Sequence, residues 1–412
     1  MRAKKARIRA KGRIFEGIVL PSEKEKIVLK LDSGYNVGFH DYEVIEEEEI
    51  EITFTEAGYA RKKEDLPEIK VISTGGTIAS KVDYSTGAVT SQFSAEEIVS
   101  DIPELAEICN IDAELLYNIL SENMKPEYWV KLARRVYGAV RDGYEGAIVT
   151  HGTDTMHYSA SALAFMLRTP VPVVFVGAQR SSDRPSSDAA VNMICSAHTS
   201  LSDLGEVVVV MHGSTSDEFC HIHRGVKVRK NHTSRRDAFQ SVNYPPLGKV
   251  WPDGKMEWIG ERMKRGEREL ELFDRLEERV ILIKFYPGLS PEILDFYYEK
   301  GFRGFVLEGT GLGHVSTDWV ETVKRVAEDS LVVMTSQCLW GRVCDRVYDT
   351  GRYLLKAGVV EGEDILPEVA LIKVMWLLGN FELDEAKRLV RENLVGEINY
   401  RTGYGMESQR GF

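Results

Sequence analysis

The sequence predicts an α/β protein: a two-domain core of parallel sheets flanked by helices, preceded by a small β-barrel-like domain. At 412 residues the chain is too long for one ordinary core. Its first part alternates polar and apolar residues, and its remainder alternates buried strands with helical patterns. The expected units are a small all-β domain (1–66), two α/β domains (67–259 and 280–412) and a charged linker (260–279).

The N-terminal unit has the pattern of a small antiparallel sheet or barrel. Short alternating runs such as R-I-F-E-G-I-V-L and K-I-V-L-K-L are separated by P-S-E-K and D-S-G, and Glu46–Glu49 forms an acidic run. Modules of this kind usually bind partners, so residues 1–66 are predicted to be a partner-binding domain. The charged stretch from Arg61 to Pro67 has no periodicity and is expected to be a linker.

From Ile69 onward the pattern is strand, loop and helix, repeated. The runs I-K-V-I-S, G-A-I-V-T, P-V-V-F-V-G and E-V-V-V-V-M lack polar alternation, as strands covered on both faces do. Ser94 and Glu97 form a capping box at a helix start, and apolar residues from Trp129 to Val140 share one face of another helix. Alternating elements of this kind predict a parallel, doubly wound sheet.

A second set of strands begins near Val280. It contains I-L-I-K-F-Y, G-F-V-L-E and L-V-V-M-T-S, each followed by a helical pattern. The charged stretch between Gly260 and Arg279 separates the two sets and is the expected interdomain connection.

Composition narrows the function classes. No apolar run approaches the roughly 20 residues of a membrane span, and no apolar segment of a signal peptide follows the basic N-terminus, so we expect a cytoplasmic protein that does not bind membranes. The five scattered cysteines indicate reduced thiols. A net charge of −12 disfavours a protein that wraps nucleic acid over its whole surface.

Two predicted strand ends carry hydroxyl side chains. V-I-S-T-G-G-T places Thr77 after two glycines, and T-H-G-T-D-T-M places Thr153 and Asp154 after the next buried run. Ligand sites gather at the carboxyl ends of parallel strands. The lysine of a phosphate-binding loop is missing, but a simple tight turn at T-G-G-T stays open on spacing alone. Downstream, Lys230 could serve as a base if a buried carboxylate accompanies it.

These segments resemble the two signatures of the bacterial-type asparaginase and glutaminase family. The resemblance extends from about residue 68 to near the C-terminus, where P-E-V-A-L-I-K-V-M-W-L-L is similar to the family's late helix. It implies a nucleophile, a second threonine, an aspartate and a lysine, which match Thr77, Thr153, Asp154 and Lys230. For substrate binding it implies Tyr84, Ser121, Glu122 and Gly152. Glu122 stands where secreted members commonly have glutamine, so selectivity between asparagine and glutamine stays open.

The chemistry that the resemblance implies needs no metal or cofactor in this chain. Thr77 attacks a side-chain amide, and Lys230, its protonation set by Asp154, is the candidate base with Thr153 as relay or water positioner. Backbone N–H groups at the glycine-flanked strand ends would stabilise the oxyanion. Which group takes the first proton stays open.

A β module ahead of the core resembles one branch of the family, the glutaminase subunits (D subunits) of archaeal glutamyl-tRNA(Gln) amidotransferases. This resemblance implies a partner, the E subunit of the amidotransferase, which uses ATP and Mg²⁺ and contacts tRNA(Gln), and a homodimer within a heterotetramer. The alternatives are a stand-alone cytoplasmic L-asparaginase and a non-catalytic binding protein on the same fold. The non-catalytic binding protein is the weakest of these alternatives, because the complete set of signature residues is present.

Other features have plainer interpretations. The cluster His212, Cys220, His221 and His223 does not have the spacing of a structural zinc site, so core or surface histidines are expected. The basic residues of the segment 224–236 are expected to form a solvated face rather than a tRNA contact. The seven basic residues among the first 13 are expected to lie on the solvent-exposed face of a strand. Trp376 is expected to be a core residue.

Overall fold

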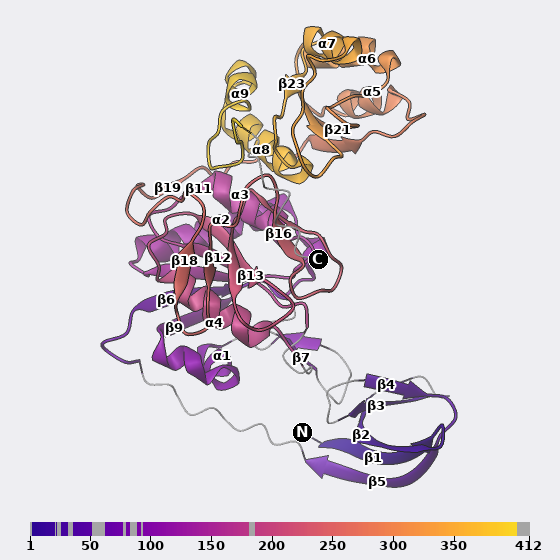
Figure 1. Cartoon of the computed structure of the whole chain (residues 1–412), viewed down its shortest axis with the longest axis vertical. Coiled ribbons are helices and arrows are strands. Elements are labelled where there is room, and N and C mark those ends of the chain that lie inside the picture. The colour runs from indigo at the N-terminus through magenta and orange to yellow at the C-terminus, as the bar shows by residue number, and fades with distance from the viewer. Residues whose placement is uncertain are drawn as a thin grey trace.

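A computed structural model describes most of the chain (Figure 1). The described residues are 2–20, 22, 26–31, 36–51, 62–76, 80–82, 89–91, 94–180 and 186–401.

The N-terminal unit is an antiparallel five-stranded sheet in the order β4-β3-β2-β1-β5, as the alternating pattern predicts. Its strands are β1 (Arg2–Ala10), β2 (Arg13–Leu20), β3 (Ile27–Leu31), β4 (Asn36–Phe39) and β5 (Glu43–Glu51). Ala6, Ile8 and Leu29 lie in its small core. Figure 1 shows the sheet as a separate lobe.

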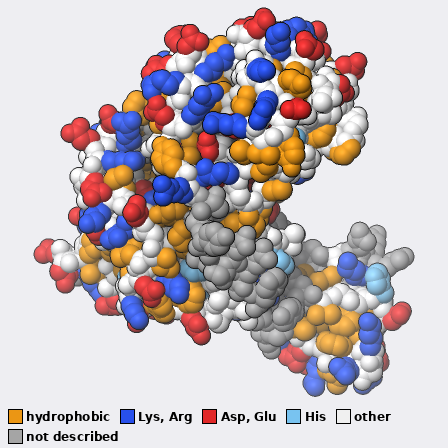
Figure 2. Space-filling view, turned by 45° about the horizontal axis from the view of Figure 1, so that its top comes forward, with side chains coloured by type: hydrophobic (Ala, Val, Ile, Leu, Met, Phe, Trp, Pro, Cys, Tyr) orange, Lys and Arg blue, Asp and Glu red, His pale blue; other side chains and the backbone are white. Residues whose placement is uncertain are grey.

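The basic residues of β1 face an acidic strand. In the antiparallel register Lys4 lies opposite Glu49 and Arg9 opposite Glu43, and Arg9 donates to Glu43 at 2.7 Å. The β1 cations are therefore largely matched by β5 carboxylates, which agrees with a solvated strand face and leaves no broad basic surface on this strand pair. Figure 2 shows the same mixing elsewhere, with Lys and Arg side chains interspersed among Asp and Glu over the visible face of the molecule.

The central unit is built on an eight-stranded sheet in the order β18-β17-β14-β13-β12-β10-β6-β9. Five strands are parallel: β6 (Glu68–Ser73), β9 (Asn110–Leu115), β10 (Gly146–Thr150), β12 (Val173–Val176) and β13 (Val207–His212). The other three continue the sheet through antiparallel pairs: β14 (Cys220–Arg224) pairs with β13, β17 (Gly248–Val250) pairs with β14, and β18 (Met256–Trp258) pairs with β17. The expected all-parallel sheet is therefore mixed, because the described segments between β13 and β18 contain no crossover helix that would return the chain for a parallel pairing.

Alternate residues of the parallel strands face different helices. Val149 and Phe175 pack in one cluster with α2 (Pro126–Arg141) and α3 (Met156–Met166), whereas Ile148 and Val174 pack with α4 (Ala189–Ser200) on the other face. This period of two explains why the strands are apolar without polar alternation. On the α4 side lie α1 (Ala95–Asp101), which begins at the predicted Ser94–Glu97 capping box, and the 3₁₀ helix η2 (Pro103–Glu107).

The C-terminal unit has a parallel four-stranded sheet in the order β20-β21-β22-β23. Its strands are β20 (Val280–Lys284), β21 (Gly304–Gly309), β22 (Leu331–Ser336) and β23 (Val360–Glu361). Its helices are α5 (Glu292–Glu299), η4 (Thr317–Trp319), α6 (Val320–Ala327), α7 (Asp349–Lys356), α8 (Pro367–Asn380) and α9 (Leu383–Leu389). The second strand set thus begins at Val280, as predicted.

Helix α8 joins the two α/β units. Its residues belong to one cluster that contains both Phe165 of α3 and Val306 of β21, and Trp376 stacks on Phe165 with ring centroids 5.9 Å apart. Trp376 is 6% exposed, which confirms it as a core residue. The core is therefore continuous between the two units.

Three short strand pairs complete the fold: β7 (Ser80–Val82) with β8 (Val89–Ser91), β11 (Leu167–Arg168) with β19 (Glu271–Leu272), and β15 (Val228–Lys230) with β16 (Phe239–Ser241). In the part of the chain that the structure describes, no helix has the length and apolar character of a membrane span.

Candidate active site

The two signature segments leave the sheet side by side. Strands β6 and β10 are parallel neighbours, and Ser73 lies opposite Thr150 at their carboxyl ends. The backbone N–H and the hydroxyl of Thr74 both donate to the Thr150 carbonyl oxygen, each at 3.0 Å. Both segments therefore reach the same edge of the sheet, where parallel sheets bind ligands.

Glycines allow three backbone segments to touch at this edge. Gly76 has a φ of +94°, and a Cβ there would lie 2.7 Å from the backbone nitrogen of Gly152. At Gly75 a Cβ would lie 2.5 Å from the carbonyl oxygen of Ile119, and at Gly152 it would lie 2.8 Å from the Cβ of Ser121. Side chains at these positions would push the segments apart, which explains why T-G-G-T and H-G-T-D carry glycine here.

Lys230 lies across from the second signature, at the end of β15. Its Nζ donates to the Thr153 hydroxyl at 2.8 Å and to the Asp154 carboxylate at 2.7 Å. The Lys230 side chain is 9% exposed, whereas that of Asp154 is 69% exposed. The three side chains thus form one hydrogen-bonded group in which the amine is shielded and the carboxylate faces solvent.

Ser121 lies against the second signature from a third segment, and Glu122 follows it in the chain. Ser121 begins the 3₁₀ helix η3 (Ser121–Asn123) and is 5% exposed, and the Thr155 hydroxyl donates to its carbonyl oxygen at 2.6 Å. Glu122 is exposed. The structure therefore brings together Ser121, Gly152, Thr153, Asp154 and Lys230. Thr77 and Tyr84 lie outside the described residues; Gly76, which precedes Thr77, lies against Gly152.

Sequence reasoning missed a neutral hydrogen-bond relay behind Thr153. His151 is 1% exposed, and its Nδ1 lies 2.7 Å from the Gly152 carbonyl oxygen, which only accepts, so Nδ1 carries the proton. Its Nε2 then accepts from the Ser159 hydroxyl at 2.8 Å, and the Ser159 oxygen accepts from Trp129 Nε1–H at 2.8 Å. Burial lowers the pKa of His151 to about 4, which keeps the ring neutral near pH 7. The sequence signal that could have indicated this relay was the polar residue His151 between the strand end and the glycine of T-H-G-T.

A second group of charged and polar side chains, partly buried, lies beside Lys230 and connects this segment to the C-terminal unit. Arg229 Nε is 3.6 Å from Glu368 Oε1 in the first turn of α8, and His157 Nε2 is 3.9 Å from the same oxygen. Burial raises the pKa of the Glu368 carboxyl, with Arg229 opposing it, and burial lowers the pKa of His157 to about 3. The residue next to Lys230 is thus anchored on the late helix.

The basic segment 224–236 is only partly the solvated face that its composition suggested: residues 231–235 are exposed, whereas residues 225–228 are buried. Lys227 is 0% exposed and pairs with Asp364 at 2.9 Å, and Arg224 pairs with the largely buried Glu206 at 2.8 Å. Their partners are distant in sequence, so the composition of the segment alone could not reveal these pairs. Burial lowers the pKa of Lys227, while Asp364 opposes this shift.

The histidine-rich stretch has ordinary structural partners. His212 Nε2 lies 3.0 Å from Asp217, and His223 Nδ1 lies 2.8 Å from the Ser241 hydroxyl. Within the described ranges, no group of three or more His, Cys, Asp or Glu side chains is arranged to hold a metal ion.

Family models match almost the whole chain. Residues 4–52 match the GatD N-terminal domain, residues 68–264 match the N-terminal asparaginase domain, and residues 279–389 match the glutaminase/asparaginase C-terminal domain.

Two similar proteins match along nearly the whole chain. The D subunit of the glutamyl-tRNA(Gln) amidotransferase of Archaeoglobus fulgidus is 68% identical over 405 residues, which cover 98% of this chain and 97% of the relative. The D subunit of the same enzyme from Pyrococcus horikoshii is 50% identical over 404 residues, 95% of this chain and 92% of the relative.

Solved structures match a smaller share of the chain. The thermostable L-asparaginase from Thermococcus kodakarensis is 34% identical with a TM-score of 0.73, and the match covers 81% of this chain and 100% of that enzyme. L-asparaginase I from Vibrio cholerae is 27% identical with a TM-score of 0.70, over 81% of this chain and 99% of that one. The chain therefore belongs to the family of glutamyl-tRNA(Gln) amidotransferase D subunits, built on an asparaginase core.

Proposed function

We propose that this protein hydrolyses glutamine and supplies the ammonia to a partner subunit that converts Glu-tRNA(Gln) to Gln-tRNA(Gln). The observation that carries the proposal is the reach of the similarity. A complete L-asparaginase matches only 81% of this chain, whereas the amidotransferase D subunit of A. fulgidus matches 98% of it, N-terminal domain included.

The chemistry rests on Thr77 as nucleophile. Its hydroxyl attacks the side-chain amide carbon, and Lys230 takes the proton directly or through Thr153, whose hydroxyl lies 2.8 Å from Nζ. The tetrahedral oxyanion accepts hydrogen bonds from backbone N–H groups at the glycine-rich strand ends. The amide nitrogen leaves as ammonia after receiving that proton, and a γ-glutamyl ester on Thr77 remains.

Water then completes the reaction. It attacks the ester carbonyl, passes a proton to the Lys230 group and releases glutamate and the free Thr77 hydroxyl. In this scheme Asp154 sets the protonation of Lys230, and its 69% exposure places it where solvent or substrate can reach it. Ser121 holds the substrate's α-carboxylate, Glu122 meets its ammonium group, and Tyr84 contributes to substrate binding.

The proposed partner is the E subunit of the amidotransferase, which would bind ATP, Mg²⁺ and the tRNA, so this chain itself needs no cofactor. We place the N-terminal sheet at the contact with that partner and the complex in the cytoplasm. A homodimer of this chain within a heterotetramer would let a neighbouring copy complete each active site.

A second function, L-asparaginase activity without a partner, is favoured by the match to two L-asparaginase structures at 34% and 27% identity. The two functions differ in what they require. An asparaginase acts at full rate alone, whereas a coupled glutaminase responds to its partner complex.

The test measures ammonia release from glutamine and from asparagine by the purified chain, alone and then with its co-purified partner, Glu-tRNA(Gln) and ATP. We expect glutamine hydrolysis to rise at least about tenfold on assembly. Rapid asparagine hydrolysis at the same rate with and without the partner would instead establish the second function.

Thr77→Ala isolates the nucleophile within the same assay. We expect glutamine hydrolysis to fall by about 10³-fold or more, whereas Thr317→Ala, an exposed threonine of the C-terminal unit, stays near wild type. Near-normal ammonia release by Thr77→Ala would remove Thr77 from the mechanism.

A further inference from the structure

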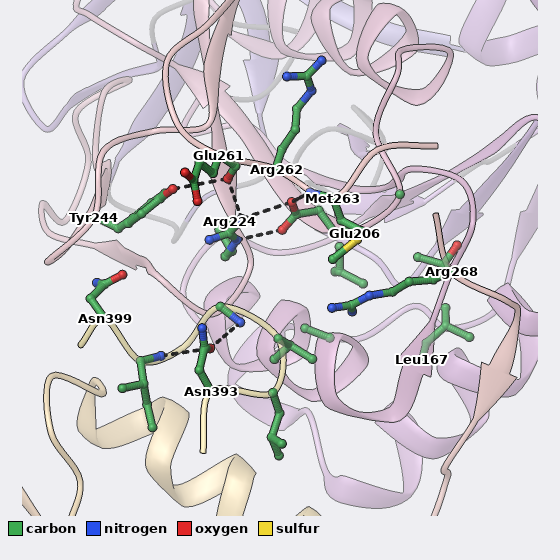
Figure 3. A pocket seen from close by; sticks show the side chains of 18 of the residues that line it. Leu167, Glu206, Arg224, Tyr244, Glu261, Arg262, Met263, Arg268, Asn393 and Asn399 are labelled. Atoms are coloured by element: carbon green, nitrogen blue, oxygen red, sulfur yellow. Dashed lines mark hydrogen bonds and ion pairs between the residues drawn. The ribbon is translucent and has the colours of Figure 1, made fainter. Parts of the chain in front are cut away.

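A cavity of about 800 Å³, whose lining residues are drawn in Figure 3, lies beside the start of β13, at the opposite end of the parallel strands from Lys230. Lys230 and Thr153 lie where the parallel strands end, near the start of α3. The cavity is lined by Ala164 at the far end of α3 and by Val207 at the start of β13. The eleven residues of α3 correspond to about 16 Å of helix, so the cavity is separate from the candidate active site.

Two arginines in the cavity wall have carboxylate partners. Arg224 donates to both oxygens of Glu206, at 2.8 and 3.3 Å, and the backbone N–H of Met263 donates to the same carboxylate at 3.0 Å. Arg262 donates to Asp203 at 3.2 Å. The carboxylates of Glu206 and Asp203 are therefore already paired with arginines of the protein.

Arg268 differs from these two. Across the described residues it makes no hydrogen bond or ion pair, although it is only partly exposed. Figure 3 shows its side chain extending into the cavity with no dashed line to a neighbour. Burial lowers the pKa of this guanidinium, Glu206 opposes the shift, and Arg168 and Arg224 add to it. The cation therefore loses part of its hydration without a bonded partner in return.

We propose that this cavity, named the Arg268 cavity, binds a small organic anion whose carboxylate or phosphate group pairs with Arg268. The planar guanidinium presents a fork of N–H donors that matches either group. The volume lies in the range of small-molecule sites, and the apolar wall residues Leu167, Met263 and Val395 suit the body of an organic ligand. The inference goes beyond glutamine hydrolysis, because no step of that reaction uses this edge of the sheet.

Isothermal titration calorimetry on the full-length chain tests the proposal with AMP, citrate and adenosine. Saturable binding of AMP or citrate with a Kd below about 10 mM supports the site. The anion that binds more tightly indicates whether the site prefers a phosphate or a carboxylate. If AMP binds, adenosine, which lacks the phosphate, should bind at least about tenfold more weakly. Saturable binding of neither anion would overturn the proposal.

Variants locate the binding. Arg268→Gln should weaken the anion at least about tenfold, Arg268→Lys should fall between, and Arg275→Gln, an exposed arginine outside the cavity, should stay within about twofold. Lys230→Ala should bind the anion as wild type does, because the active site lies at the other edge. Unchanged binding in Arg268→Gln, or loss of binding in Lys230→Ala, would overturn the assignment. Should Arg268→Gln fail to fold, Arg268→Lys carries the same test.

Discussion

Two lysine–aspartate pairs lie three residues apart on one segment and have different surroundings. Lys227 and Asp364 are 2.9 Å apart and 0% and 3% exposed, whereas Lys230 and Asp154 are 2.7 Å apart and 9% and 69% exposed. The first pair joins the two α/β units, and Asn399 donates to the same carboxylate at 2.7 Å. The second keeps one partner open to solvent and has a threonine hydroxyl as third member. Two pairs with similar distances are therefore assigned different roles: the buried pair joins the two units, and the exposed pair takes part in the proposed mechanism.

The largest expected effect is on activity at the exposed pair. Lys230→Ala should lower glutamine hydrolysis by about 10²–10⁴-fold, since a positioned base supplies about that factor, and should change the unfolding free energy by less than about 1 kcal/mol. Steady-state ammonia release and chemical denaturation measure the two quantities. Lys230→Arg supplies a positive charge but cannot act as a base near pH 7, because the guanidinium stays protonated, so this variant should be inactive. An active Lys230→Arg enzyme would make charge, rather than proton transfer, the role of this residue.

At the buried pair the effect should fall on stability. Lys227→Met leaves Asp364 charged and buried and should cost about 3–5 kcal/mol of unfolding free energy, measured by denaturant titration. The activity of the molecules that remain folded should fall less than about tenfold. Lys324→Met, on an exposed face of α6, is the matched control and should stay within about 0.5 kcal/mol. If Lys227→Met were as stable as the control, the joint between the units would not depend on this pair.

A smaller effect concerns the neutral His151 relay, which contains no charge pair. Its folded pKa of about 4 lies below the ordinary value of 6.5, so its contribution is present above pH 6.5 and is lost as the pH falls toward 4. The difference corresponds to roughly 3 kcal/mol. His151→Asn should reduce the acid sensitivity of the unfolding free energy by up to that amount, measured by denaturant titration between these pH values. Identical pH profiles for wild type and variant would show that another group causes the loss.

The sequence predicted those parts of the fold that depend on local pattern. The Ser94–Glu97 capping box lies at a helix start, and the buried runs around Ile148 and Val174 are parallel strands, because hydrogen bonding and side-chain period are properties of neighbouring residues. The antiparallel strands β14, β17 and β18 were not predicted. Their short, mixed sequences gain their strand partners only from the edge of the parallel sheet.

The candidate site shows the same division. Thr153, Asp154 and Lys230 were predicted from motifs, and their mutual contacts agree with the chemistry that those motifs imply. The roles of Arg224 and Lys227 were misjudged because Lys227 and Asp364 are 137 residues apart in the chain. Such pairings depend on the tertiary fold, so no local reading of a basic segment reveals them.

Helix α8 has a consequence for how this protein unfolds. Its side chains pack in an apolar cluster that both α/β units share, so each unit loses part of its apolar interior once α8 leaves. We therefore expect the two units to unfold together, so that denaturation of the part from residue 68 onward gives a single transition. Trp376, which stacks on Phe165 in the shared cluster, is one of the chain's six tryptophans, and its fluorescence should change in that transition.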